Sequence, residues 1–290
     1  MQPRISIVSL SLLLVLFSQA VIADSPVWKI EKNGQQLFIG GTIHVLAASD
    51  YPLPSTFDQA YRQSAILVLE TDMQKLQSPK FQQTMLRELS YTDGRNLQKV
   101  LNRSTYQDLE QFFSARGIPM AAIVNFKPGM VLTMMTMIEL QRLGIDGIGV
   151  DAYYSARAIE DSKKLGELEP VETQIAFLAN MGAGQENEML SFSLSDVEQL
   201  SAMMKSMKDA WRRGDVKKLE KIGISELQND FPEIYKALLV DRNNAWIPQI
   251  EAMARTKEIE LILVGALHLA GEDGLLAQLK ARGYKIKMML

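Results

Sequence analysis

LFIGGTIH, residues 37–44, and LILVGALH, residues 261–268, are two apolar runs that each end in Gly-x-x-His. The chain of 290 residues has only two histidines, and these two motifs hold both of them. A short apolar run that stops at a glycine is typical of a buried strand. Because glycine has no Cβ, it lets the backbone turn sharply and come close to a ligand. The repeated motif therefore predicts two strands that each deliver a histidine to a loop.

The segments around the two motifs follow the same order of strand, loop, helix and strand. Before the first motif, Asn33-Gly34 is the dipeptide that favours a tight hairpin turn. Ser55 is placed to cap the helix that follows His44, and Gly283 to end the helix that follows His268. The expected elements are, in order, strands 28–31 and 36–39, helix 55–64, strand 65–70, strand 260–264, helix 275–282 and strand 284–289.

These elements predict an α/β fold with a mixed central sheet built from two β-(GxxH)-α-β units, one from each end of the chain. Two matching units suggest quasi-twofold symmetry. Right-handed crossovers would place both histidines at the carboxyl edge of the sheet, where ligands usually bind in open α/β folds. We expect one domain over 24–290, in which 24–74 and 256–290 form the sheet core and 75–255 forms a mainly helical insert.

Helix signals punctuate the middle of the chain. Residues 104–107 resemble a capping box, and Pro128 begins a methionine-rich helix that Gly144 would end. Asp151 and Ser195 are each placed to cap a further helix. The methionine-rich stretch is expected to be a packing face of the helical insert rather than a cofactor site.

The N-terminal residues predict a signal peptide at 1–23. Arg4 precedes an apolar run of about 13 residues, which is too short to span a bilayer comfortably, and small residues follow at 21–23. Their removal would move the net charge from −3 only to about −4. We therefore expect an exported, periplasmic or secreted protein with no membrane association after cleavage, although an uncleaved anchor stays open.

Composition excludes several classes of function. The chain has no cysteine, so neither a disulfide nor a cysteine nucleophile or ligand is available. A mildly acidic chain without basic runs gives no reason to expect a nucleic-acid partner. The sequence contains no Gly-x-Ser-x-Gly and no His-Glu-x-x-His, which argues against a serine hydrolase of the elbow type and against a zincin peptidase. The oligomeric state stays open.

The two histidines and a nearby acid suggest a metal site. Two imidazoles and one carboxylate can hold a divalent ion and leave positions for water and substrate. Glu70 is the candidate acid because it directly follows the apolar run 65–69. Asp72 would point to the same face of the sheet if that strand continued. The competing interpretation is a pair of core histidines bonded to the backbone. Read alone, Arg242 and Asn243 predict a solvated or capping cluster.

The order of motifs resembles the TraB/GumN family, whose animal relatives are the Tiki metallopeptidases. The resemblance covers nearly the whole chain after residue 23. The motifs that carry it are Trp28-Lys29-Ile30, 37–44, 68–72, Gly149-Val150-Asp151-Ala152-Tyr153 with Ala158, Leu168-Glu169 with Glu172 and Gln174, 211–215, Arg242-Asn243 with Trp246, and 264–271.

The resemblance implies a fold shared with erythromycin-esterase-like and ChaN-like proteins and a metal-dependent hydrolase site. It implies manganese, cobalt or zinc as the cofactor and a peptide or protein as the substrate. The implied central residues are His44, Glu70 and His268, with Arg242 as a further site residue. Residues expected to bind substrate or to support the centre are Gly41, Asp72, Asp151, Asn243 and Gly265. The chain departs from some relatives because it lacks the histidines that they carry elsewhere.

Three hypotheses remain open at this point. In the first, the protein is a metal-dependent peptidase in which Glu70 is a third ligand or a general base and Arg242 holds the oxyanion or a substrate carboxylate. In the second, the same pocket sequesters a peptide, a metal ion or haem without turnover. In the third, a histidine acts as a general base in hydrolysis without a metal.

Overall fold

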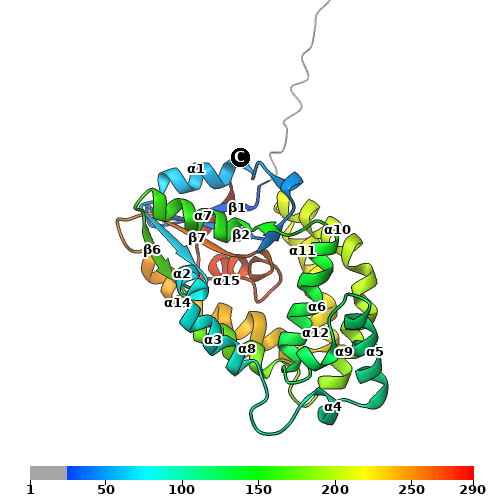
Figure 1. The fold of residues 1–290 in the computed structure, drawn as a ribbon. Coiled ribbons are helices and arrows are strands. Elements are labelled where there is room, and N and C mark those ends of the chain that lie inside the picture. The colour runs from blue at the N-terminus through cyan, green and yellow to red at the C-terminus, as the bar shows by residue number, and fades with distance from the viewer. Residues whose placement is uncertain (1–24) are drawn as a thin grey trace, which may run out of the picture.

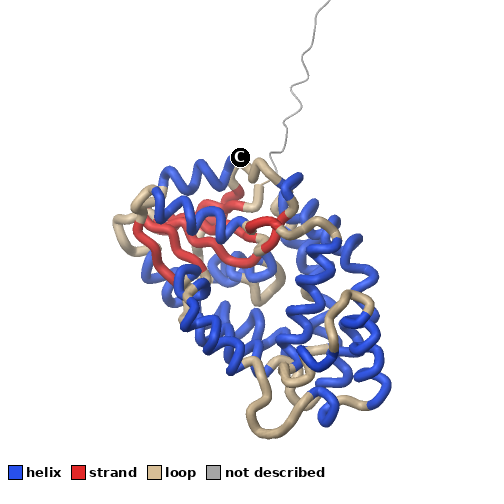
Figure 2. Tube along the Cα trace, viewed as in Figure 1, coloured by secondary structure: helices blue, strands red, loops and turns tan. Residues whose placement is uncertain are grey.

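The computed structural model describes residues 25–290, so the predicted signal peptide at 1–23 lies outside the described residues. A sheet with helices on both faces forms one part of the molecule, and a group of helices extends away from it (Figures 1 and 2). The fold is therefore mixed α/β, and its six-stranded central sheet has the order β6-β4-β7-β2-β1-β8. The six strands are β1 (Val27–Lys32), β2 (Gln35–Thr42), β4 (Ile66–Leu69), β6 (Lys164–Glu167), β7 (Glu260–Gly265) and β8 (Lys285–Met288).

The predicted hairpin opens the sheet. Strands β1 and β2 pair antiparallel from Val27↔Gly40 to Lys32↔Gln35. The turn between them needs two residues in the left-handed region, and Asn33 and Gly34 supply φ angles of 52° and 81°. The strand β2 is thereby aimed with its carboxyl end toward the loop that holds His44.

Three parallel strands define the functional edge of the sheet. Strand β7 pairs in parallel with β2 on one side, where Thr42 faces Gly265, and with β4 on the other, where Leu69 faces Leu263. The two ends of the chain therefore meet at the centre of the sheet. All three carboxyl ends lie at one edge, so the residues that follow them are brought close together.

One strand comes from the segment expected to be a helical insert. Strand β6 pairs in parallel with β4 at the edge of the sheet. Its sequence, KLGE, lacks the apolar run of a central strand and is mostly exposed. The segment 75–255, expected to be mainly helical, thus also supplies one edge strand, which needs only backbone pairing along one side.

Each face of the sheet carries its own hydrophobic core. The helices α1 (Ser55–Gln63) and α7 (Val150–Glu160) cover one face, on which Phe38, Leu67 and Leu261 are buried. The helices α14 (Asp241–Met253) and α15 (Leu275–Ala281) cover the other face (Figure 1). Successive strand residues alternate between the two cores, as the period of two requires.

Helices between residues 97 and 142, together with the helix at 186–196, form a separate lobe with its own core. Its buried centre includes Phe113, Val131 and Met135, so the methionine-rich helix packs the lobe as expected. No helix within 25–290 is both long and apolar enough to cross a lipid bilayer. The other helices are α2 (Met73–Gln77), α3 (Pro79–Glu88), α4 (Leu97–Val100), α5 (Arg103–Ser114), α6 (Pro128–Arg142), α8 (Val171–Asn180), α9 (Glu186–Asp196), α10 (Leu200–Arg212), α11 (Val216–Gly223), α12 (Ser225–Asp230) and α13 (Pro232–Tyr235).

Short elements complete the fold. Strands β3 (Val45–Leu46) and β5 (Gly147–Ile148) form a separate two-stranded sheet. The single-turn segments are η1 (Ala48–Asp50), η2 (Met120–Ala122), η3 (Val197–Gln199), η4 (Lys236–Val240) and η5 (Ala266–Leu269).

Three predicted helix caps away from the two histidines are wrong. Asn102, rather than the box at 104–107, caps α5 by accepting from the backbone N–H of Thr105. Ser195 lies near the end of α9 instead of starting a helix, and Ser55 is already inside α1. Several residues that can cap a helix lie close together in each case, and the local sequence does not decide which position becomes the N-cap.

Candidate functional site

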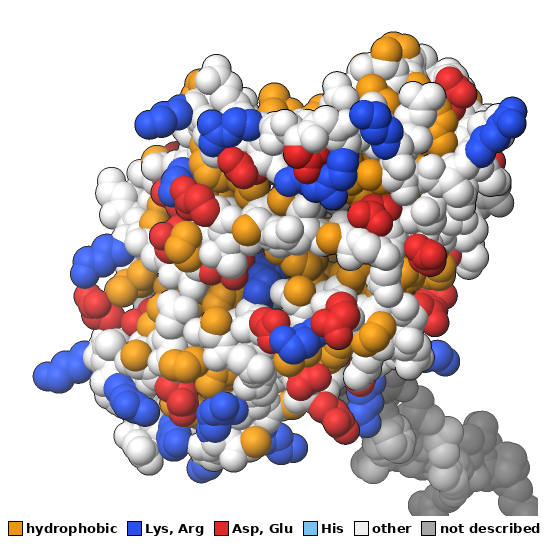
Figure 3. Space-filling model, turned by 90° about the horizontal axis from the view of Figure 1, so that it is seen from below, with side chains coloured by type: hydrophobic (Ala, Val, Ile, Leu, Met, Phe, Trp, Pro, Cys, Tyr) orange, Lys and Arg blue, Asp and Glu red, His pale blue; other side chains and the backbone are white. Residues whose placement is uncertain are grey.

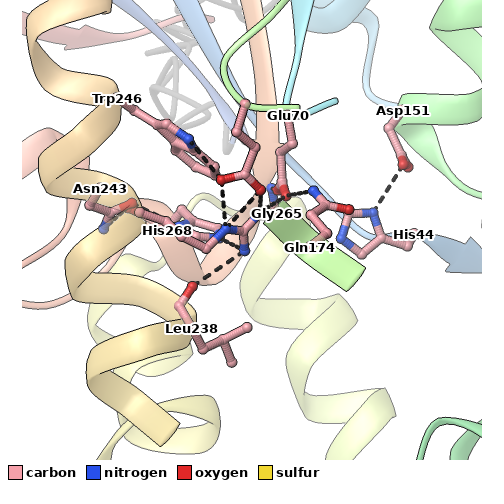
Figure 4. Close-up of polar contacts among 11 residues, drawn as sticks. His44, Glu70, Asp151, Gln174, Leu238, Asn243, Trp246, Gly265 and His268 are labelled. Carbon is pink, nitrogen blue, oxygen red and sulfur yellow. Dashed lines mark hydrogen bonds and ion pairs between the residues drawn. The ribbon is translucent and has the colours of Figure 1, made fainter. Parts of the chain in front are cut away.

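The two histidines and the predicted acid meet at the carboxyl edge of the sheet (Figure 4). Glu70 directly follows β4, and its Oε1 accepts a hydrogen bond of 2.6 Å from the backbone N–H of Gly265 at the end of β7. An ideal Cβ on Gly265 would lie 3.3 Å from Glu70 Oε1, 3.5 Å from His44 Nε2 and 3.7 Å from His268 Cδ2. All three side chains therefore surround one point, and a glycine there leaves the space between them open.

His44 is oriented by Asp151. The imidazole Nδ1 lies 3.0 Å from Asp151 Oδ2, and 60 % of the His44 side chain is exposed. Asp151 lies in the first turn of α7 and was expected to cap it, but the N-cap is Gly149 and the Asp151 carboxylate faces His44 instead. With Nδ1 donating to a carboxylate, Nε2 is the ring atom left to act at the site.

The electrostatic environment favours the charged form of His44. Burial in the site opposes that form, but the charge and hydrogen bond of Asp151 and the charge of Glu70 together raise the pKa of His44 above its ordinary 6.5. Water reaches the exposed ring and screens part of this attraction. His44 is therefore a basic imidazole with an accessible Nε2, which must lose its proton before it can act as a base or a metal ligand.

Gly149 brings α7 close enough for this contact. A Cβ at Gly149 would lie 2.3 Å from the carbonyl carbon and oxygen of His44, so a side chain cannot fit. The backbone N–H of Val150 also donates to the Ile43 carbonyl at 3.1 Å. The glycine before Asp151 thus positions its carboxylate by permitting close packing of the helix start.

His268 has a different environment from His44. Its ring is buried and packs against Trp246, with the ring centres 4.5 Å apart. Nδ1 lies 2.7 Å from Asn243 Oδ1, and Arg242 Nη1 lies 3.0 Å from Nε2. Since Arg242 can only donate, Nε2 accepts and Nδ1 carries the proton.

The same contacts keep His268 neutral. The Asn243 amide nitrogen donates to the carbonyls of His268 at 3.2 Å and Asp273 at 2.9 Å, which leaves its oxygen to accept from the ring. Burial, aided by the charge of Arg242, lowers the pKa of His268 to about 3.

Arg242 forms the centre of a buried charge network. Its guanidinium donates to Glu70 Oε2 at 2.6 Å and to Glu169 Oε1 at 2.7 Å through Nη2, and to Glu169 again through Nε. Through Nη1 it donates to His268 and, at 3.3 Å, to the Leu238 carbonyl. Its side chain is only 11 % exposed, so the interpretation of Arg242 and Asn243 as a solvated or capping cluster is wrong.

The saturation of Arg242 limits its chemical role. A guanidinium has five N–H groups, and the protein itself accepts from all of them here. None is left over for an oxyanion or a substrate carboxylate. The arrangement instead indicates that Arg242 positions Glu70, Glu169 and His268.

Glu70 is ionised in this network. Burial alone would raise its pKa, but the basic groups around it, His268, Arg242 and His44, and the Gly265 N–H outweigh burial and lower the pKa of Glu70 to about 2. Gln174 Nε2 also donates to Oε2 at 3.3 Å. The carboxylate is therefore available as an acceptor, a base or a ligand at neutral pH.

Two predicted site residues have other roles. Asp72 caps α2 by accepting from the backbone N–H groups of Gln74 and Lys75, because β4 ends at Leu69 and no strand carries Asp72 toward the site. Gly41 allows β2 to pack against η5, since a Cβ there would lie 3.2 Å from the Ala266 Cα. Its carbonyl accepts from Trp211 Nε1 at 2.6 Å.

A cavity of about 430 Å³ adjoins the site. His44, Glu70, Asp151 and Arg242 are the charged or ionisable residues of its lining. Thr42 and Thr71 also border it, and their buried hydroxyl oxygens have no hydrogen-bond partner among the described residues. Such a volume is in the range of small-ligand pockets.

The sequence reasoning missed several members of this site. Glu169 and Gln174 were noticed only as parts of family motifs, although both contact the central groups. Trp246, whose Nε1 donates to Glu169 Oε2 at 3.2 Å, was likewise not predicted as a site residue. A charged or polar residue inside a buried pattern, as in Leu168-Glu169, is the local signal that could have indicated them.

The side chains of the site are of the types that bind a divalent metal ion, but their arrangement does not leave all three of them free to bind one. His44 Nε2 and Glu70 Oε1 face the point above Gly265. The third candidate donor, His268 Nε2, already accepts a hydrogen bond from Arg242. As they stand, no three His, Asp or Glu side chains among the described residues are arranged so that they could hold a metal ion together. A metal held by all three would require Arg242 to move away from His268.

Comparison with known proteins gives one assignment. A search of curated proteins found no match. The family described as the TraB/PrgY/gumN family matches residues 26–288, which is almost the whole described chain. The protein belongs to the TraB/PrgY/gumN family.

Proposed function

We propose that the protein is a metal-dependent hydrolase that cleaves an exported peptide or protein. The observation that carries this proposal is the convergence of His44, Glu70 and His268 around Gly265 beside a cavity. The peptidase activity of the Tiki proteins, which the sequence resembles, gives the substrate class. The proposed location is the periplasm or the outside of the cell, from the signal peptide predicted at 1–23.

The two halves of the site are proposed to come from two related β-(GxxH)-α-β units. The support is that each histidine follows a parallel strand at the centre of the sheet. A helix then follows each strand, α1 after β2 and α15 after β7, and these two helices lie on opposite faces of the sheet. In this interpretation the fold joins the ends of the chain so that the site has one histidine from each.

A divalent ion would be held by His44 Nε2 and Glu70, with His268 as a third ligand once Arg242 has left it. When bound, such an ion polarises a carbonyl group and lowers the pKa of a water molecule. Asp151 fixes the His44 tautomer that presents Nε2, and Asn243 does the same for His268. Glu70, kept ionised by its neighbours, serves as a ligand or accepts a proton from the attacking water.

A specific observation favours a second candidate, hydrolysis without a metal. Arg242 already supplies positive charge between Glu70, Glu169 and His268, and the Asp151–His44 pair has the arrangement of a carboxylate that orients a general base. In that scheme the neutral form of His44, with its Nδ1–H held by Asp151, takes the proton from water through Nε2. Both candidates use the same residues and differ in whether activity needs an added ion.

Purified protein without residues 1–23 tests the proposal. It would be stripped of metal, reloaded separately with manganese, cobalt or zinc, and assayed by mass spectrometry on peptide pools. We expect cleavage that is restored by one of the ions and lost in His44→Ala. Cleavage that survives metal removal would support the metal-free candidate. Peptide binding without any product would reject both candidates and favour the sequestering protein.

A further inference from the structure

The cavity beside the site has two chemically different walls. Its charged or ionisable lining residues are His44, Glu70, Asp151 and Arg242, which all belong to the candidate site. The apolar wall comes from α2, α8 and η4 and consists of side chains that are only partly buried by the protein. These residues are Met73, Leu76, Phe177, Leu178 and Leu238.

Phe177 lies where this cavity meets a second one. The second cavity, also about 430 Å³, shares Phe177 and Arg242 with the first and continues along α8 and α13. An extended peptide advances about 3.3–3.6 Å per residue, so two adjoining cavities provide room for several residues. In the space-filling view from below, hydrophobic side chains gather around a hollow in the surface (Figure 3).

We propose that the first cavity is a specificity pocket for an apolar side chain next to the bond that is cleaved, with Phe177 as the residue that sets its size. This inference rests on the proposed hydrolase function and names the substrate class of the same site. A charged substrate side chain would have to leave water without a partner on the apolar wall, which is unfavourable. A leucine or phenylalanine side chain would instead remove both its own surface and that of the wall from water.

The position of the apolar wall indicates what kind of group occupies the pocket. Leu238 is part of it, and the carbonyl of the same residue accepts from Arg242, whose guanidinium also contacts Glu70. A side chain in the pocket would therefore contact Leu238, which is linked to Glu70 through Arg242. This continuity argues for a substrate side chain rather than a separate ligand at a remote site.

The test uses capped pentapeptides Ac-Ala-Ala-X-Ala-Ala-NH₂ in which X is Leu, Phe, Ala, Asp or Lys. Binding is measured by calorimetry and cleavage by mass spectrometry, with wild type, Phe177→Ala and Phe177→Trp. We expect wild type to prefer Leu and Phe over Asp and Lys by at least about 10-fold, the scale that apolar pockets commonly reach. Phe177→Trp, which fills the pocket, should reduce the preference for Phe most, whereas Phe177→Ala should weaken the preference for Leu.

Leu86→Ala is the matched control because Leu86 is exposed on α3 and lies outside both cavities. Thermal unfolding of each variant establishes that it is folded. Cleavage with no dependence on X, or a dependence that neither Phe177 variant changes, would overturn the pocket and leave the hydrolase intact. Binding that depends on X and on Phe177 without cleavage in any metal would support the pocket and reject the hydrolase.

Discussion

His44 and His268 follow the same Gly-x-x-His motif at the ends of adjacent parallel strands, yet their surroundings differ in almost every respect. The His44 side chain is 60 % exposed and is bonded to a carboxylate, whereas His268 is 4 % exposed and lies between an amide and a guanidinium. These contacts shift the two pKa values in opposite directions. A repeated motif thus placed both rings at one point but did not give them one chemical role.

The comparison explains how a buried charge network can support an accessible base. Arg242 contacts His268 and the two carboxylates directly, and it has no hydrogen bond to His44 in the described structure. The His268 side is therefore buried and held by hydrogen bonds, and the His44 side remains open to the cavity. We expect mutations on the first side to affect folding and activity together, and mutations on the second to affect mainly activity.

The largest effect is expected for Arg242→Ala. It leaves Glu70 and Glu169 buried without their shared cation, which typically lowers the free energy of unfolding by about 3–5 kcal/mol. Urea denaturation of the metal-free protein measures this loss. Arg242→Lys is the control, because it keeps the charge but loses the fork of donors and should recover only part of the stability. A change below about 1 kcal/mol would show that the network contributes as little as a surface ion pair.

The next largest effect separates the two histidines. His268→Ala removes a buried ring and the partners of Asn243 and Arg242, so we expect a loss of about 2–4 kcal/mol in the free energy of unfolding. His44→Ala should cost less than about 1 kcal/mol, since its ring is largely exposed. Chemical denaturation of both variants beside wild type measures the contrast. Equal losses would remove the distinction between a supporting and a reacting histidine.

The pH dependence should differ in sign between the two rings. The raised pKa of His44 contributes stability that is present below the unfolded value of 6.5 and is lost as the pH rises through the folded value. The lowered pKa of His268, about 3, means that the unfolded chain binds the extra proton first, so its contribution to stability falls as the pH drops below 6.5. Titration of the ring carbon signals by NMR, without metal, measures both values.

Asp151→Asn sharpens the same measurement. The substitution removes the neighbouring negative charge, so we expect the pKa of His44 to fall toward 6.5 while that of His268 stays low. An unchanged His44 titration in this variant would show that Asp151 does not orient the ring as proposed.

The smallest effect concerns Asp72, the predicted site acid that lies away from the histidines. Asp72→Ala removes the cap of α2 and should lower the free energy of unfolding by about 1 kcal/mol without changing the rate of peptide cleavage. Asp72→Asn retains a capping oxygen and should cost less. Thermal unfolding and the peptide assay measure the two quantities, and a large loss of activity would return Asp72 to the site.

Local signals determined much of the framework. The apolar runs, the Asn33-Gly34 turn and the residues that end helices predicted the hairpin, the two central strands and the helices that follow them. The edge strand β6 and the choice among adjacent caps were not predictable, because an edge strand has little apolar pattern and neighbouring polar residues cap about equally well.

The sequence by itself predicted that each histidine follows a buried strand, since a short apolar run that stops at a glycine is typical of such a strand. Only the tertiary structure decided what surrounds each ring. The surrounding side chains come from segments outside the two motifs, and the direction in which they point depends on how those segments pack. They are Asp151, Glu169, Arg242 and Asn243. Burial, paired charge and the direction of each hydrogen bond arise from that packing, and they set the protonation of the two histidines.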